Sequence, residues 1–210
     1  MNNMPYKPID DFYYAELSDF DHLVLPHVAG VQRPLYELER ETVIREFCRR
    51  TGALIGQHNG ITIYKDVSEY TVTGIPDLMD VLTLKDLRYS ESGEPVNRMA
   101  YLLDQDRTTF NLQSNWADSL KENVLIPIIS LTLCRGADRV EQNFFDRWSD
   151  GIAAGIISRL MLSPRKVWSN PQAARETFDP RYDEAISNAK IAVSRAFTVY
   201  APRTVLHGFT

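Results

Sequence analysis

The four histidines of this 210-residue chain are the first side chains to consider for metal or acid–base chemistry. His22 and His27 are five positions apart with Pro26 between them, so they lack the i, i+4 geometry of two zinc ligands on one helix. His58 and His207 likewise have no ligand spacing. We interpret all four as surface or capping residues, and the sequence predicts no metal site.

The two cysteines, Cys48 and Cys134, form no Cys-x-x-Cys motif. Cys48 lies in a predicted helix and Cys134 in a predicted strand. We interpret both as small buried hydrophobic residues of a protein made in a reducing cytoplasm. A disulfide between them is the alternative interpretation.

Acidic residues are the remaining candidates for catalysis. Asp104 and Asp106 could hold a hard cation, but two acids in a loop are more often simply solvated. A glycosidase needs two carboxylates in an apolar cleft, and no pair is singled out by the sequence. Gly-rich phosphate loops and the Gly-x-Ser-x-Gly elbow are absent. We therefore predict a protein that is not an enzyme and carries no cofactor.

The charge pattern argues against a protein that grips nucleic acid. The formal net charge is -5, and acids and bases are interspersed. The arginines between residues 33 and 50 are partly offset by glutamates in the same stretch, as on a solvated or interfacial helix face. This pattern is compatible with a channel through which DNA slides. No signal peptide and no membrane span are predicted, so we expect a protein made in the cytoplasm with no membrane contact.

The order of sequence patterns predicts an α+β fold: a helical bundle with an inserted antiparallel β module and extended arms at both ends. Residues 1–19 form an aromatic and acidic N-terminal arm, which needs its own domain or a neighbour to dock on. The helical domain comprises 20–56 and 138–200, the β module is 57–137, and 201–210 is a C-terminal tail.

Helical periodicity marks four segments. A short helix over 20–30 bends at Pro26, and a longer one over 34–51 buries Phe47 and ends at Gly52. A third helix, over about 140–163, carries Trp148 and Ile152 on one stripe, with Gly151 and Gly155 at its edge for tight packing. After Pro164 and Trp168, Asn170 is expected to cap one kinked or two consecutive helices over 171–197.

The last helix has a regular apolar seam that includes Tyr182, Ile186 and Val193. We interpret the seam as the core face of the domain, with a subunit interface as the alternative. Between the helical parts, alternating residues and turn signals predict strands at 61–64, 70–73, 79–89, 108–113, 122–126 and 128–135.

Two segments resemble a known family. The longer runs from Phe144 to Gly155, continues through Arg159–Leu162, and ends with Pro164, Lys166, Trp168–Pro171 and Ala173–Ala174. It closely resembles the C-terminal signature of head-to-tail adaptor proteins of tailed phages, also called head-completion or tail tubular protein A-like proteins. The shorter segment, Val43–Thr51, resembles the early helix of that family. The order of helix, β module and helix pair also agrees, while Pro180 interrupts a helix that the family pattern keeps continuous.

The resemblance implies a structural virion protein. Such adaptors form a ring, commonly of twelve subunits, which joins the portal protein to the tail nozzle or tail tube and extends the DNA channel without reading DNA sequence. In several such adaptors the C-terminal tail reaches the portal, which makes Val205, Leu206 and Phe209 the expected portal-docking residues, with Phe197 and Tyr200 leading into them. The alternatives are a tail-associated cell-wall hydrolase and another neck or tail-completion protein.

Overall fold

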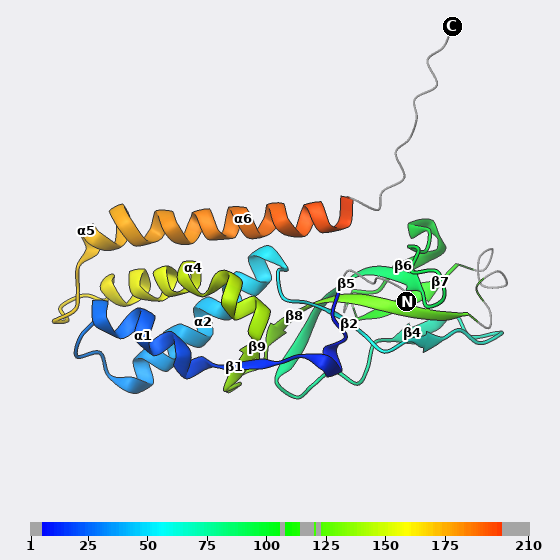
Figure 1. The fold of residues 1–210 in the computed structure, drawn as a ribbon, viewed down its shortest axis with the longest axis horizontal. Helices are drawn as coiled ribbons and strands as arrows, with labels where there is room; N and C mark the ends of the chain where they lie inside the picture. Colours follow the sequence, from blue (N-terminus) through cyan, green and yellow to red (C-terminus); the bar gives the residue numbers. More distant parts are fainter. Residues whose placement is uncertain (1–5, 106–107, 114–119, 121–122, 199–210) are drawn as a thin grey trace, which may run out of the picture.

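The computed structural model describes residues 6–105, 108–113, 120 and 123–198. It has an α+β fold, as the sequence predicts: helices gather at one end of the molecule and antiparallel strands at the other (Figure 1). The last long helix, α6, runs along one side of the helical end. The chain passes from the helical end to the main sheet between α2 and β2, and it returns between β8 and β9.

Except for the strand Tyr14–Glu16, the strands form one run from residue 55 to 141, with helices before and after it and a short 3₁₀ turn within it. The α-helices are α1 Asp21–Val24, α2 Arg33–Thr51, α4 Gln142–Met161, α5 Pro171–Ala173 and α6 Asp179–Thr198. The short 3₁₀ turns are η1 Ile9–Asp11, η2 Leu17–Phe20, η3 Leu25–His27 and η4 Arg98–Ala100, and η5 Ala174–Phe178 is a π-helical segment.

Within the described residues the strands form three antiparallel sheets. Their bounds are β1 Tyr14–Glu16, β2 Ile55–Gln57, β3 Ile61–Thr62, β4 Glu69–Thr71, β5 Met79–Tyr89, β6 Tyr101–Leu103, β7 Thr109–Leu112, β8 Val124–Leu133 and β9 Arg139–Glu141. In the main sheet β8 is central, with β5 on one side and β2 and β3 on the other. A smaller sheet has the order β4-β7-β6, and β1 pairs with β9.

Phe47 lies at the meeting point of the three long helices. Its ring centroid is 5.9 Å from that of Phe144, 5.8 Å from Trp148 and 6.2 Å from Tyr182. The side chain is fully buried, and the Tyr182 hydroxyl donates to the Val43 carbonyl at 3.4 Å. One aromatic side chain of α2 therefore holds α4 and α6 together, because edge and tilted ring contacts add to the energy of burial.

The N-terminal arm docks on its own chain. Ala15 in β1 pairs with Val140 in β9, and Ile9, Phe12 and Leu17 are buried. A Cβ on Gly56 would lie 2.5 Å from Ile9, so the arm crosses β2 at close contact. The sequence left open whether the arm docks on its own domain or on a neighbour, and for residues 6–19 the structure favours the first.

The central strand passes through a proline. The sequence predicts two strands over 122–126 and 128–135, but β8 is one strand, and Pro127 lies inside it. The Pro127 carbonyl accepts from the His58 amide at 2.9 Å, beyond the end of β2 and before β3 begins. Since a residue in an antiparallel ladder directs its N–H and C=O to the same side, the missing N–H falls in the gap between these two strands and no ladder bond is lost.

Pro180 is also accommodated without a break. The chain is helical from Pro171 to Thr198, and the π segment Ala174–Phe178 comes directly before α6. Proline clashes with the carbonyl four residues earlier, here that of Glu176, and the wider π turn relieves that clash. The Ser158 hydroxyl on α4 donates to the Asp179 carboxylate, which ties the start of α6 to α4 directly after the π segment.

Other predicted boundaries need correction. The helix expected from about 140 begins at Gln142, because Val140 belongs to β9 and the Glu141 carboxylate caps the helix by accepting from the Phe144 amide at 2.7 Å. β2 begins at Ile55, inside the segment assigned to the helical domain. Strands β1, β6 and β9 have three residues each and were not predicted, since so short a segment shows little alternation.

We expect Phe47→Ala to lower the free energy of unfolding by about 3–5 kcal/mol, because it removes a fully buried ring from the junction of three helices. Urea unfolding followed by circular dichroism measures the loss. Leu38→Ala on the same helix is the control: Leu38 is 59% exposed, so its effect should stay within about 0.5 kcal/mol. Equal losses in the two variants would contradict the central role of Phe47.

Candidate assembly surface

Helices α4 and α6 touch at two glycines. A Cβ on Gly151 would lie 2.2 Å from the Cβ of Ala185, and one on Gly155 would lie 2.7 Å from the Tyr182 ring. Both distances are far below van der Waals contact, so only glycine permits this approach. Ile152 on α4 and Ile186 on α6 are buried beside the contact. The glycine spacing therefore serves packing between two helices of one chain.

A tight turn joins the two helices. The Met161 carbonyl at the end of α4 accepts from the Asn170 amide at 3.0 Å and from the Ser169 hydroxyl at 3.3 Å. The Asn170 side chain accepts from the Ala173 amide at 3.1 Å, as expected of an N-cap. Trp168 packs partly buried against the core with Lys166 over its ring. Together, the turn and the helices form a fixed hairpin.

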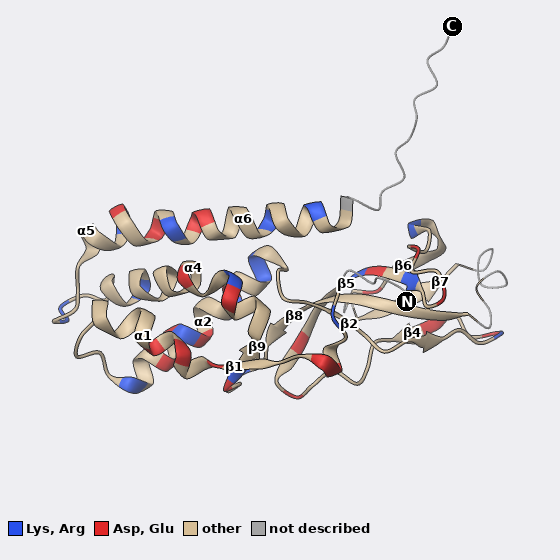
Figure 2. Cartoon of the chain, viewed as in Figure 1, with Lys and Arg blue, Asp and Glu red and all other residues tan. Residues whose placement is uncertain are grey.

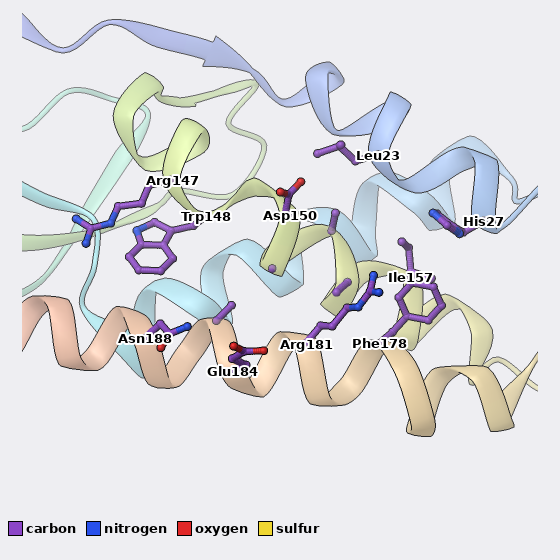
Figure 3. Close-up of a pocket in the computed structure, with 14 residues that line it drawn as sticks. Leu23, His27, Arg147, Trp148, Asp150, Ile157, Phe178, Arg181, Glu184 and Asn188 are labelled. Carbon is purple, nitrogen blue, oxygen red and sulfur yellow. The ribbon is translucent and has the colours of Figure 1, made fainter.

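A groove of about 480 Å³ runs along this hairpin, between the α1–η3 segment, α4 and α6 (Figure 3). Its floor is made of small and apolar residues, Gly151, Ala153, Ala154, Ile157, Phe178 and Ala185. At one end the His27 ring meets Phe178 edge-on, 5.4 Å between centroids, and at the other end lies Trp148. The groove thus lies over the glycine contact itself.

The rim of the groove carries charges of both signs. Arg147 and Asp150 extend from α4, and Arg181 and Glu184 from α6 (Figure 3). Among the residues that the structure describes, none of the four makes an ion pair, although Arg147 lies over the Trp148 ring at 4.9 Å. Sequence analysis did not single out these four residues. In the sequence, only their positions beside the apolar stripes of α4 and α6 distinguish these charged residues.

The apolar seam of α6 changes character along the helix. Tyr182, Ile186 and Ala189 are buried, whereas Val193 is only partly covered. Val193 lines a second groove, of about 350 Å³, with Trp148, Phe12 and other residues of the arm and α4. The first half of the seam is therefore core, and the second half is covered less completely.

The expected portal-docking residues fall mostly beyond the described part. Tyr200, Val205, Leu206 and Phe209 lie outside the described residues. Phe197 is partly buried and stacks on Tyr6 of the N-terminal arm, with 5.5 Å between ring centroids and 24° between planes. The structure therefore brings Phe197 to the arm of its own chain.

The residues considered for chemistry are dispersed. His22 and His27 are exposed on the first helical segment, and the His58 ring bonds to the Thr73 carbonyl. His207 and Asp106 lie outside the described residues, while Asp104 accepts from the Gln105 amide. Within the described ranges no three His, Cys, Asp or Glu side chains gather as metal ligands would.

Both cysteines are free thiols in different surroundings. Cys48 is completely buried in α2, and burial raises the pKa of its thiol to about 12. Cys134 is partly exposed, and its pKa is raised mainly by burial and by the nearby Asp80 carboxylate. A raised pKa leaves little of the reactive thiolate at neutral pH, so neither residue has the environment of a catalytic nucleophile.

A buried ion pair lies within β5. Arg88 is 1% exposed and donates to the Asp86 carboxylate at 3.2 Å. Burial raises the pKa of Asp86, and the Arg88 and Arg98 charges oppose that change. The Arg88 guanidinium also reaches the Gly93 carbonyl at 3.4 Å. These contacts link β5 to the turn that follows it, which is a structural role.

Comparisons with known proteins add no relative: no protein-family model and no curated protein sequence matches this chain. Of the helices that the structure describes, none has the length and apolar character to cross a membrane. The geometry itself defines the class of protein: a helical hairpin with a β module and an open groove along the hairpin.

We expect Gly151→Ala to destabilise the protein by about 1–3 kcal/mol, because the new methyl group overlaps Ala185. Helix propensity alone would change stability by about 1 kcal/mol in the opposite direction. Urea unfolding measures the effect. The double variant Gly151→Ala with Ala185→Gly should lose less than the two single variants together, because it restores the space between the helices. Additive losses would show that the close approach is not the cause.

Proposed function

We propose that this protein is a structural component of a tailed-phage virion, a head-to-tail adaptor that assembles as a ring, with twelve subunits the expected number. In this proposal it acts without catalysis, in the neck of the particle, after assembly in the host cytoplasm. Its partners are its own copies, the portal protein and a tail nozzle or tail tube protein. Genomic DNA passes through the channel without sequence-specific contacts.

The resemblance and the fold support this proposal together. The segment from Phe144 to Ala174 that resembles the adaptor signature folds as α4, its turn and the start of the next helix. Its notable residues have packing roles: Gly151 and Gly155 admit α6, and Asn170 caps the following helix. The segment Val43–Thr51 supplies Phe47 to the same junction. Both resembling segments thus build one hairpin scaffold.

The observation that carries the proposal is the groove beside that hairpin. It has an apolar floor and a rim of charges of both signs, Arg147, Asp150, Arg181 and Glu184, which make no ion pair within the part of the chain that the structure describes. An apolar centre with a polar rim is the anatomy of a protein interface. We assign the groove to a neighbouring copy of the chain, since charges of both signs complement a surface of mixed charge, and acids and bases are interspersed over this molecule (Figure 2).

A ring requires that two different surfaces of each subunit meet, because cyclic assembly is heterologous. The groove provides one such surface. The neighbour must then present a different face, and the exposed side of α2 around Leu38 is available for it. In this proposal the contact repeats around a cyclic axis with a rotation that closes the ring.

Copy number tests the proposal directly. Quantitative mass spectrometry of virions purified from the source phage should give about one copy of this chain per portal subunit, as expected for matched rings. Native mass spectrometry of the purified chain, alone and with portal protein, should show the ring. Absence from the virion would overturn the proposal. Clearing of cell walls in a zymogram by the purified chain would favour the hydrolase instead.

Removal of residues 201–210 should abolish attachment to the portal and leave the fold intact. All residues with described contacts are kept, so the circular dichroism spectrum and urea midpoint should not change. Co-sedimentation with portal rings measures attachment. Substituting Val205, Leu206 and Phe209 with Ser should have the same effect, whereas Thr204→Ala with His207→Ala is the matched control. Unchanged attachment of the truncated chain would rule out portal docking by the tail.

A further inference from the structure

A basic pocket lies where the helical end meets the main sheet. It has a volume of about 440 Å³ and is lined by Arg49, Arg50, Thr51 and Gly52 at the end of α2, Leu82, Thr83 and Lys85 of β5, and Ser130 of β8. Figure 2 shows basic residues at this end of α2. Three positive side chains therefore border one small hollow, and none of its described lining residues is acidic.

One polar atom in this pocket lacks a partner. The Ser130 side chain is fully buried, and its hydroxyl oxygen makes no hydrogen bond with any residue that the structure describes. The other two hydroxyls are satisfied: Thr51 donates to the Phe47 carbonyl at 2.7 Å, and Thr83 donates to the Leu84 carbonyl at 3.2 Å. A buried hydroxyl without a partner costs free energy, so an acceptor beside Ser130 would stabilise the protein.

Gly52 keeps the space beside that hydroxyl open. A Cβ at Gly52 would lie 3.1 Å from the Ser130 Oγ and 3.0 Å from the Lys85 Nζ. The two polar atoms therefore converge on one point, which any larger residue would fill. Gly52 also has a φ of 64°, so glycine is favoured there by the backbone as well.

Strand β5 has two β-bulges beside Gly52 and Ser130. The pairing of β5 with β8 shifts between Val81 and Thr83 and again between Leu84 and Asp86, so Leu82 and Lys85 have no partner in the ladder. Both bulged residues line the pocket, and Thr83 between them pairs with Ser130. The Lys85 carbonyl accepts from the Arg98 guanidinium at 2.8 Å, which holds the second bulge. Bulges commonly redirect a side chain near a functional site.

The dipole of α2 accounts for only part of the positive charge around the pocket. Cations in the last turn of a helix are favoured by its dipole, and Arg49 and Arg50 occupy that turn of α2. Arg50 is further paired with Glu46 and Asp183, each at 3.4 Å. Arg49 makes no ion pair with any residue that the structure describes. Lys85 comes from the sheet, so the helix dipole does not account for its position.

We propose that this pocket binds a phosphate group, held by the Lys85 ammonium and the Ser130 hydroxyl with Arg49 at the entrance. Phosphate oxygens accept from both donors, and charge-assisted hydrogen bonds of this kind are strong. The pocket exceeds a bare phosphate ion in volume, so the group can be carried by a larger molecule. Free phosphate and the phosphodiester backbone of DNA share this chemistry. The inference stands independently of the ring proposal.

Isothermal titration calorimetry of the full chain with inorganic phosphate, at constant ionic strength in sodium chloride, tests the proposal. The wild-type chain should give saturable binding. Lys85→Met should weaken it about tenfold or more, and Ser130→Ala less strongly. Arg49→Gln, an exposed substitution that leaves the core untouched, should also weaken it. Lys65→Met, which removes an exposed lysine before β4, is the matched control and should bind as the wild type does.

A second arm distinguishes the two sources of phosphate. Fluorescence anisotropy with a DNA duplex of about 20 base pairs should show binding that Lys85→Met loses and Lys65→Met keeps, if the backbone is the ligand. Binding of phosphate without DNA assigns the site to a free or small phosphorylated ligand. Urea unfolding checks that each variant is folded. Binding of neither probe by the wild type, or equal binding by Lys85→Met and Lys65→Met, would overturn the proposal.

Discussion

The close approach of α4 and α6 is the constraint on which the helical end of this protein depends. A Cβ on Gly151 would lie 2.2 Å from Ala185, so the distance between the two helices is set by the absence of a side chain. Because α6 lies this close, Tyr182 reaches the Phe47 ring and its hydroxyl bonds to the Val43 carbonyl of α2. The groove and its rim are consequences of the same spacing, since their residues flank the glycine contact.

The main sheet depends on its central strand, β8. This strand pairs with β5 from Leu125 to Leu133 and with β2 and β3 in turn, and the same residues are buried. Ser130 in β8 pairs with Thr83 of β5 on one side and with Ile55 of β2 on the other. It also lines the basic pocket at the end of α2. The proposed phosphate site therefore lies between the end of α2 and the strands β5 and β8, which leave a hollow where they meet.

The sequence indicated much of this scaffold. Helix α2 with Gly52 at its end, β5 over residues 79–89, and the Asn170 cap followed by Pro171 were all predicted, because each rests on local signals of periodicity or capping. The α+β class followed from the order of those signals. Short strands were not predicted, and the single strand β8 was predicted as two, over 122–126 and 128–135, because pairing partners far along the chain decide such features.

The sequence by itself thus determined which segments are helical, that α2 ends at Gly52, and that two glycines on one helix would admit a close neighbour. Only the tertiary structure decided that the neighbour is α6, that the arm docks through β1 on β9, and that Phe197 meets Tyr6. It alone brought Lys85, Ser130 and Gly52 to one point. The physical reason is range: propensity and capping act over a few residues, whereas these contacts join positions separated by tens of residues and depend on packing of the whole chain.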